Sequence, residues 1–323
     1  MNDYIKLILC LLISFLFSFV FCKVHLKMFN SKPKDQIEVK DIKPNHVFKS
    51  MGGIDFLLST LIVFIIFNIK NTNQTFYVLL FTIIYYALIG LIDDLIKVLY
   101  QDNKGLSGFI RIIFEIFGVL IIINFTSLNL LEFIKLTPNR YIYIGGFAII
   151  YAIICVLGCC NGVNLTDGLD GLVTITYILA VTPFLYLSLL QQNFVIASFI
   201  MCLLGSMLAY LCFNFNPSKL IMGDVGSIPL GALIAIIAML LNYELLILVS
   251  GLIYIIEALS VILQVSFFKI SKGKRIFKMA PLHYHFIKLG MKESNVVLLF
   301  TIFSIIFSIL ATIIGVILWN FYY

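Results

Sequence analysis

The sequence contains little charge. Only 12% of its 323 residues are Asp, Glu, Lys or Arg, whereas 62% are hydrophobic and the mean hydropathy is +1.09. A soluble domain averages roughly 25% charged residues, and a globule this apolar has too few polar side chains to cover its surface. The composition therefore excludes a soluble protein and predicts one whose main solvent is the lipid bilayer.

Several other signals are missing. The seven cysteines lie in or beside apolar runs, so no disulfide framework is expected. No small-residue cleavage site follows the first apolar run, which ends at Cys22, and we interpret that run as a retained span. The Gly-x4-Gly-Lys-Ser/Thr pattern of a phosphate-binding P-loop is absent, and we find no repeat of fixed period.

Apolar runs of membrane-spanning length dominate what is present. A helix needs about 20 apolar residues to cross the hydrocarbon core. The runs give ten candidate spans, at 4–22, 54–69, 76–92, 109–125, 141–159, 172–190, 194–212, 228–241, 245–265 and 296–319. Nine spans are the alternative, because only Asn242-Tyr243-Glu244 separates the eighth from the ninth. We expect an all-α polytopic membrane protein of about ten helices, forming a single integral membrane domain over residues 1–323.

The loops between these spans alternate in charge. Most of the 22 Lys and Arg residues fall in the odd-numbered loops, whereas the even-numbered loops hold only Lys70, Lys135 and Arg140. The positive-inside rule then places the odd loops in the cytoplasm and both termini outside. The predicted cytoplasmic loops cover about 23–53, 93–108, 160–171, 213–227 and 266–295.

The informative polar residues lie in these same cytoplasmic loops. Asp93 and Asp94 are expected to end a span, where a solvated helix end with an Asp94–Lys97 pair is the simple alternative. Neighbouring helical residues point about 100° apart, so we do not expect these two to chelate one ion face-on. Asp224, flanked by glycines, has the character of a site for Mg²⁺, with helix capping as the alternative.

Two further segments carry chemistry. The run Asn164-Leu165-Thr166-Asp167-Gly168-Leu169-Asp170-Gly171 offers acceptors and flexible backbone for a hydroxyl-bearing ligand or an ion, although Asp167 or Asp170 could cap the next helix. His283 and His285 stand in a basic segment suited to phosphate binding. Their i,i+2 spacing is poor for helical zinc, and lipid headgroups would explain the lysines but not the histidines.

Two acids inside spans need partners. Glu257 lies in the middle of the ninth span, where we favour an internal hydrogen bond bracing a broken helix over a transport role. Arg111 and Glu115, one helical turn apart at the start of the fourth span, are expected to pair.

Seven motifs in order make the chain resemble a known family. They are Asp93-Asp94, Lys104-Gly105-Leu106-Ser107, VNLTDGLDGL at 163–172, FN at 213–214, MGDVGS at 222–227, ILQV at 262–265 and KRIFKMAPLHYHF at 274–286. This set resembles the bacterial phospho-N-acetylmuramoyl-pentapeptide-transferases, in the polyprenyl-phosphate N-acetylhexosamine-1-phosphate transferase superfamily. The resemblance runs from about residue 45 to 293.

The resemblance implies an activity, partners and a location. Phospho-MurNAc-pentapeptide would pass from its UDP conjugate to undecaprenyl phosphate, giving lipid I and UMP for peptidoglycan synthesis, with Mg²⁺ as cofactor. The enzyme would be a multi-pass protein of a bacterial inner (plasma) membrane. The resemblance admits a homodimer, and nucleic acid is not among the expected partners.

The resemblance also implies roles for residues at matching positions. Asp224 would be the metal ligand, and Asp93, with Asp94 beside it, the base for the lipid phosphate; His283 would stand at the catalytic edge. The expected substrate-binding residues are Asn164, Asp167, Gly168, Leu169, Asp170, Asn214, Lys104, Arg111, Ser50 and His285.

The chain departs from the family pattern at a few of these positions. Ser50 replaces a Thr, Ile221 a Phe expected to stack on uracil, and Arg111 a Lys; Tyr284 replaces the middle of three histidines, and Ile287 replaces a Glu. One alternative is therefore a related transferase using another UDP-N-acetylhexosamine. A transporter is a second alternative, but transport sites lie near the midplane in proteins with internal repeats. For the transferase, direct in-line attack and a two-step route through an Asp nucleophile both stay open.

Overall fold

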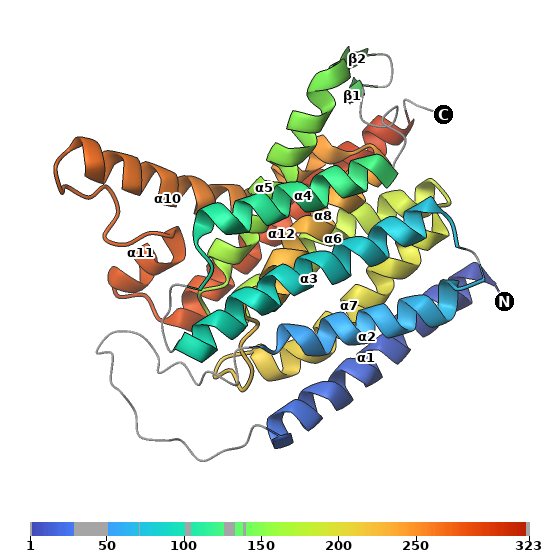
Figure 1. The fold of residues 1–323 in the computed structure, drawn as a ribbon, viewed down its shortest axis with the longest axis horizontal. Helices are drawn as coiled ribbons and strands as arrows, with labels where there is room; N and C mark the ends of the chain where they lie inside the picture. Colours follow the sequence, from blue (N-terminus) through green and yellow to red (C-terminus); the bar gives the residue numbers. More distant parts are fainter. Residues whose placement is uncertain are drawn as a thin grey trace.

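The computed structural model describes residues 2–28, 51–70, 72–100, 105–125, 133–137 and 140–320. Within them the chain forms a bundle of long helices lying side by side (Figure 1). The longer ones are α1 (Asp3–Met28), α2 (Gly53–Asn68), α3 (Gln74–Tyr100), α4 (Gly108–Phe125), α5 (Ala148–Thr166), α6 (Leu172–Leu190), α7 (Phe194–Asn214), α8 (Asp224–Leu241), α10 (Leu252–Ile270) and α12 (Glu293–Asn320). In the described part of the chain nine helices are long and apolar enough to cross a membrane, and α2 is a shorter apolar helix. The predicted all-α polytopic architecture is confirmed.

The fifth span differs from its prediction at both ends. A small hairpin precedes it, in which β1 (Phe133–Thr137) pairs antiparallel with β2 (Arg140–Tyr143) and Phe133 lies opposite Tyr143. The aromatic and β-branched residues at 141–143, which read as the start of a span, favour strand pairing instead. A short 3-10 turn (Gly145–Phe147) follows, and α5 then runs to Thr166. The expected loop at 160–171 therefore begins only after Thr166.

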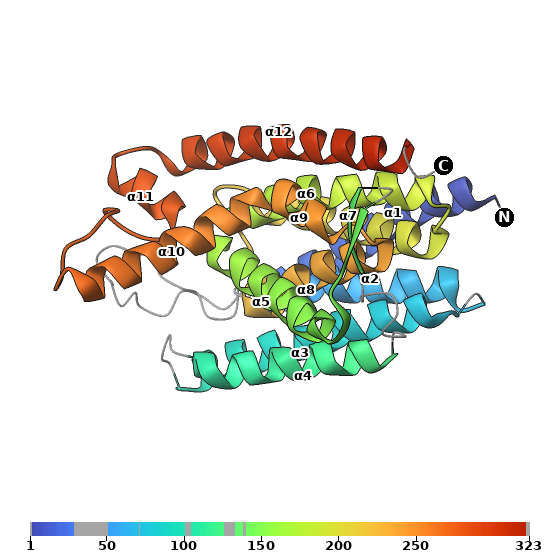
Figure 2. The ribbon, with the colours of Figure 1, turned by 90° about the horizontal axis from the view of Figure 1, so that it is seen from above.

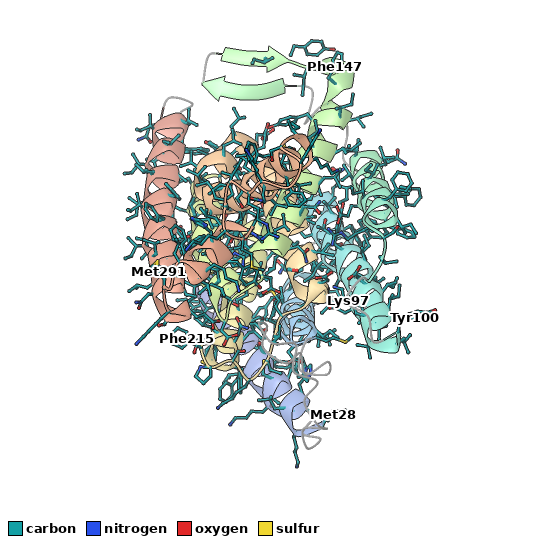
Figure 3. All side chains as sticks on the ribbon, turned by 90° about the vertical axis from the view of Figure 1, so that its left-hand side faces the viewer. Met28, Lys97, Tyr100, Phe147, Phe215 and Met291 are labelled. Carbon is teal, nitrogen blue, oxygen red and sulfur yellow. The ribbon has the colours of Figure 1, made fainter. Side chains whose placement is uncertain are left out.

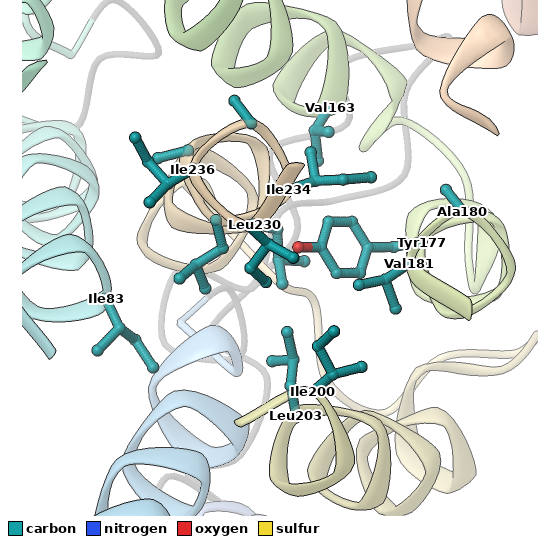
Figure 4. Close-up of a cluster of buried hydrophobic side chains, with 14 of the residues drawn as sticks. Ile83, Val163, Tyr177, Ala180, Val181, Ile200, Leu203, Leu230, Ile234 and Ile236 are labelled. Atoms are coloured by element: carbon teal, nitrogen blue, oxygen red, sulfur yellow. The ribbon is translucent and has the colours of Figure 1, made fainter. Parts of the chain in front are cut away.

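Helix α8 forms the interior of the bundle. Every residue of it except Asp224 and Leu240 is buried, and it packs against α3, α5 and α6. Figure 4 shows the Tyr177 ring of α6 pointing toward Leu230 and Ile234 of α8. Because lipid chains are as apolar as these side chains, close packing and internal polar contacts stabilise such an interior more than the hydrophobic effect does.

Helix α8 approaches α3 closely at Gly90. A side-chain carbon at residue 90 would overlap the carbonyl of Asp224 and the backbone of Val225. Glycine therefore lets the two backbones meet at the point where α8 begins. This contact brings Asp93 and Asp94 beside Asp224.

Polar side chains join α1 to its neighbours α2 and α7. Burying a polar group in an apolar solvent is costly unless it finds a partner, and these groups find theirs within the bundle. The contacts are Lys6 Nζ to Asn68 Oδ1 at 2.7 Å, Ser18 Oγ to the Ser206 carbonyl at 2.8 Å, and His25 Nδ1 to Asp55 Oδ2 at 2.9 Å.

The ninth span is divided. A 3-10 turn (Glu244–Leu246) and the short α9 (Ile247–Ser250) end at Gly251, after which α10 begins. Figures 1 and 2 show α10 leaning away from the bundle, and α11 (Leu282–Lys288) returning toward it.

The two ends of the bundle differ in what they carry. Figure 3 views it from the end where α3 finishes, and Lys97, Phe215 and Met291 lie at this end. Helix α1 begins and α12 ends at the opposite end (Figures 1 and 2). This arrangement agrees with the prediction that both termini lie on one side of the membrane. That this side is the outside stays a prediction.

Candidate active site

Three carboxylates from two helices form the centre of the site. Asp93 and Asp94 do not end α3, as the sequence had suggested, because the helix continues to Tyr100. Asp94 Oδ2 accepts a hydrogen bond from the Val225 N–H at 3.0 Å, which fixes α3 to the first turn of α8. Asp93, Asp94 and Asp224 each offer an oxygen within 4.8 Å of the others, a group able to hold a metal ion. The expectation that the two neighbours would not chelate one ion face-on considered α3 alone, whereas here each of the three carboxylates offers one oxygen to the group.

The Lys97 ammonium lies among these carboxylates. Its Nζ is 2.6 Å from Asp93 Oδ2, 2.8 Å from Asp224 Oδ2 and 3.6 Å from Asp94 Oδ1. The expected Asp94–Lys97 pair is therefore the longest of three contacts. Grouped acids that are partly removed from water need a cation, and an all-oxygen donor set of this kind fits a hard divalent ion such as Mg²⁺.

Helix α5 contributes the amide that orients Asp224. Asn164 Nδ2 donates to Asp224 Oδ1 at 2.8 Å and to Ser227 Oγ at 2.9 Å. Gly223, and not Asp224, is the N-cap residue of α8. The alternative reading of Asp224 as a helix cap is therefore wrong.

The loop after α5 lies beside this centre. Asp167 accepts a hydrogen bond from the Gly223 backbone N–H, and its pKa is raised to about 8, mainly by desolvation and then by the charges of Asp224 and Asp94. The N-cap residue of α6 is Gly171, with no side-chain cap, so neither Asp167 nor Asp170 caps that helix.

Asp170 has a different set of contacts. Its carboxylate accepts hydrogen bonds from the Ser218 hydroxyl at 2.8 Å and the Ser218 N–H at 3.0 Å. Its own N–H donates to Glu293 Oε1 at 2.9 Å. Asp170 thus fastens the loop to the segment before α8 and to the start of α12.

His283 approaches the loop from the far end of the sequence. It is fully buried, and a side-chain carbon at Gly168 would collide with its Nε2. Only glycine leaves room for this contact. The Tyr284 hydroxyl donates to the Gly168 carbonyl at 3.1 Å, so Tyr284, at a position where the family pattern has His, still contacts the loop.

Glu257 holds the helix that carries His283. Its two carboxylate oxygens accept hydrogen bonds from the Leu282 N–H at 2.7 Å and the His283 N–H at 3.1 Å. His283 Nδ1 is 3.3 Å from Glu257 Oε2. The prediction that Glu257 makes an internal hydrogen bond is correct. The bonds stabilise the start of α11, however, and not a break in the helix that carries Glu257.

The remaining predicted residues lie further from the carboxylates or outside the described chain. Asn214 bridges the Thr174 hydroxyl, at 2.7 Å, and the Leu220 carbonyl, at 3.0 Å. His285 accepts from the Lys278 N–H at 3.0 Å, and Leu169 packs against the apolar core. Ser50 and Lys104 lie outside the described residues.

Arg111 of α4 also reaches the centre. Its Nη2 donates to Asn161 Oδ1 at 2.7 Å, and its Nη1 lies 3.9 Å from Asp224 Oδ2. Sequence reasoning missed Asn161, Ser218, Ser227 and Glu293 as parts of the site. For Asn161 a signal existed, since it stands three residues before Asn164 on the same face of α5.

Comparisons of the sequence with known proteins point to one family. The sequence pattern of glycosyl transferase family 4 matches residues 76–242, which include the three carboxylates. A phospho-N-acetylmuramoyl-pentapeptide-transferase of Clostridium acetobutylicum is 37% identical over 314 residues, covering 94% of this chain and 98% of that protein.

Further relatives with the same name come from other bacteria. One from Clostridium botulinum (strain Alaska E43) is 34% identical, covering 97% of this chain and 99% of its own. One from Rickettsia massiliae is 34% identical, covering 94% of this chain and 90% of its own. The chain therefore belongs to the phospho-N-acetylmuramoyl-pentapeptide-transferase family, a group of membrane-embedded phosphoglycosyl transferases.

Proposed function

We propose that this protein transfers phospho-MurNAc-pentapeptide from its UDP conjugate to undecaprenyl phosphate in a bacterial plasma membrane. An oxygen of the lipid phosphate attacks the phosphorus bonded to the sugar. The bond from that phosphorus to the bridging oxygen of UDP breaks, so that UMP leaves and lipid I forms. The product would serve peptidoglycan synthesis.

One observation carries this proposal. Carboxylates and cations from α3, α4 and α8, together with the Asn164 amide of α5, converge at one end of the bundle, although they come from distant parts of the sequence. Phosphoryl transfer between two anions needs alignment and charge compensation more than covalent chemistry. Lys97 and Arg111 supply two positive groups beside Asp224 that can offset phosphate charge.

The residues fit a divalent cation. Asp224 would hold Mg²⁺, and Asp93 and Asp94 lie close enough to contribute an oxygen each. The Lys97 ammonium contacts the same carboxylates, so this group of acids already binds one cation. When bound, Mg²⁺ would neutralise charge on the diphosphate of the donor. In our scheme Asp93 accepts the proton of a protonated lipid phosphate as attack begins.

The nucleotide would occupy the loop after α5. Asn164, Asp167, Gly168, Leu169 and Asp170 would line this pocket, together with Asn214, and His283 would close its edge. Ser50, Lys104, Arg111 and His285 would complete the contacts to the substrates. The contact of His283 with Gly168 supports this assignment, because it links the two segments.

A transfer assay tests the proposal. Purified protein is given UDP-MurNAc-pentapeptide labelled in the peptide, a polyprenyl phosphate and Mg²⁺, and both UMP and labelled lipid are measured. We expect the two products in equal amounts. Transfer only from UDP-N-acetylglucosamine would show the related transferase instead, and a trapped phospho-MurNAc–protein adduct would overturn the one-step route.

A further inference from the structure

A buried ion pair on α4 stands directly behind the site. The Glu115 side chain is only 1% exposed, and that of Arg111 is 20% exposed. Among the described residues, neither carboxylate oxygen of Glu115 has a hydrogen-bond partner, and the Nε of Arg111 has none either. The shortest ionic contact of Glu115 is Arg111 Nε, at 3.6 Å from its Oε1. Because a buried carboxylate without a counter-charge is strongly destabilising, Arg111 is tied to Glu115.

The guanidinium of Arg111 points its three nitrogens to three different groups. Its Nε faces Glu115, its Nη2 donates to Asn161 Oδ1 at 2.7 Å, and its Nη1 is 3.9 Å from Asp224 Oδ2. Asn161 is itself fixed, since its Nδ2 donates to the Leu157 carbonyl at 2.8 Å. A planar guanidinium that is hydrogen-bonded at Nη2 and ion-paired at Nε has its Nη1 in a set direction.

We propose that Glu115 is a positioning residue, which holds the Arg111 guanidinium so that Nη1 projects beside Asp224 to bind a phosphate oxygen of a substrate. This inference rests on the proposed function, because it needs a phosphate ligand at the acidic centre. Glu115 itself touches no substrate. It acts by pairing with the Nε of Arg111, so that the Nη1 of Arg111 is directed toward the ligand.

The residue needed at position 111 then depends on the residue at position 115. A lysine at residue 111 has one ammonium, which cannot face Glu115 and a phosphate near Asp224 together. The buried carboxylate would draw that ammonium away from the ligand. A lysine is therefore expected to work at residue 111 only when residue 115 is uncharged.

The ligand oxygen has two candidate sources, the diphosphate of the UDP conjugate and the phosphate of the lipid. Both present the same chemistry to a guanidinium. Separate Michaelis constants for the two substrates distinguish them, because loss of a charged hydrogen bond raises KM for the substrate that made it.

The test compares four proteins: wild type, Arg111→Lys, Glu115→Met and the double variant. Losing a charge-assisted hydrogen bond corresponds to a change of about 10-fold or more. We expect each single variant to raise KM for one substrate by about 10-fold, with kcat changed far less. The double variant should recover most of that KM, because its lysine is free of Glu115. Lys70→Met, which removes an exposed cation just beyond the C-terminal end of α2, is the control.

Two results would overturn the inference. One is a double variant whose fold increase in KM equals the product of the increases in the two single variants. The other is a Glu115→Met protein with a lowered melting temperature and an unchanged KM. If Glu115→Met does not fold, Glu115→Gln keeps the side-chain volume and replaces it in the same series.

Binding of UDP alone, measured by calorimetry, separates this inference from the proposed function. If wild type binds UDP but transfers nothing, the proposed function fails. The positioning role then still predicts that both single variants bind one of the two phosphate ligands, UDP or the polyprenyl phosphate, about 10-fold more weakly than wild type, and that the double variant recovers this binding. Equal binding of UDP and equal binding of the polyprenyl phosphate in all four proteins contradict the positioning role.

Discussion

Lys97 contacts carboxylates on two helices, with its ammonium 2.6 Å from Asp93 and 2.8 Å from Asp224. At the residue scale this lysine gives the acidic centre a counter-charge before any ligand arrives. Removing one carboxylate leaves the lysine and the other acids in place. Single substitutions in this group should therefore change the chemistry more than the fold.

Asp224→Asn is the first such substitution. It removes the charge through which we propose that Mg²⁺ is held, so turnover should fall by at least about 100-fold, beyond the 10- to 100-fold typical of residues that only support a ligand. Turnover is measured as UMP release over a range of Mg²⁺ concentrations. Near-normal turnover at limiting Mg²⁺ would remove Asp224 from the metal site, and Asp3→Asn, at the opposite end, serves as control.

Asp167→Asn tests the raised pKa of Asp167. Its pKa is about 8 in the folded protein against 3.8 for an ordinary Asp. The folded chain therefore keeps a proton that the unfolded chain has lost, and the carboxyl becomes destabilising as pH rises from about 4 to about 8. We expect the melting temperature of wild type, without metal, to fall more steeply than that of Asp167→Asn between pH 5 and pH 8. Parallel curves would contradict the raised pKa.

At the element scale, the crossing of α3 and α8 decides where the carboxylates meet. Gly90 allows the approach, and Asp94 fastens it through the Val225 N–H. A change on the buried side of α3 that adds volume must push the helices apart. The acidic centre would then open even though none of its residues had changed.

Gly90→Ala measures this dependence. Overpacking of this kind typically costs about 1–3 kcal/mol, so the variant should melt at a lower temperature and lose most of its transfer activity. Gly158→Ala is a matched control, because a side-chain carbon there meets nothing within 4 Å and alanine favours a helix. Equal behaviour of the two variants would show that the close approach is unimportant.

The sequence allowed the helices to be predicted well but their ends less so. Apolar runs located the long helices because the bilayer imposes a length on each. They misplaced the start of α5, because the residues of β2 are as apolar as a span and pair with a strand. Charge normally marks the boundary of a span, so the sequence predicts a helix end at Asp93 and Asp94, whereas Lys97 offsets their charge inside α3.

The candidate site followed from its motifs in part. Charge and glycine content pointed to Asp224 and to the loop after α5, but the partners of these residues depend on how helices cross. Nothing local to Ser218 or Glu293 shows that each contacts Asp170 across more than 40 residues of sequence. Glu257 was found as an unusual acid, although its partner on α11 was not foreseen.

At the scale of the whole molecule, the ends of α3 and α5 and the start of α8 share one end of the bundle with the acidic centre. Reporter fusions test whether this end faces the cytoplasm. A reporter active only outside the cytoplasm should work when fused to either terminus and fail when inserted after Lys272. Placement of the Asp93 and Asp224 segments on opposite sides of the membrane would contradict both the fold and the proposed site.

Helix α1 begins and α12 ends at the end of the bundle opposite the one that carries Lys97 (Figures 1, 2 and 3). An affinity tag at either terminus would therefore attach the protein to a sensor chip with the acidic centre facing the flowing solution. Soluble nucleotides could then be titrated onto immobilised protein without the chip blocking their approach. Tethering through the first or the last residue should give the same response.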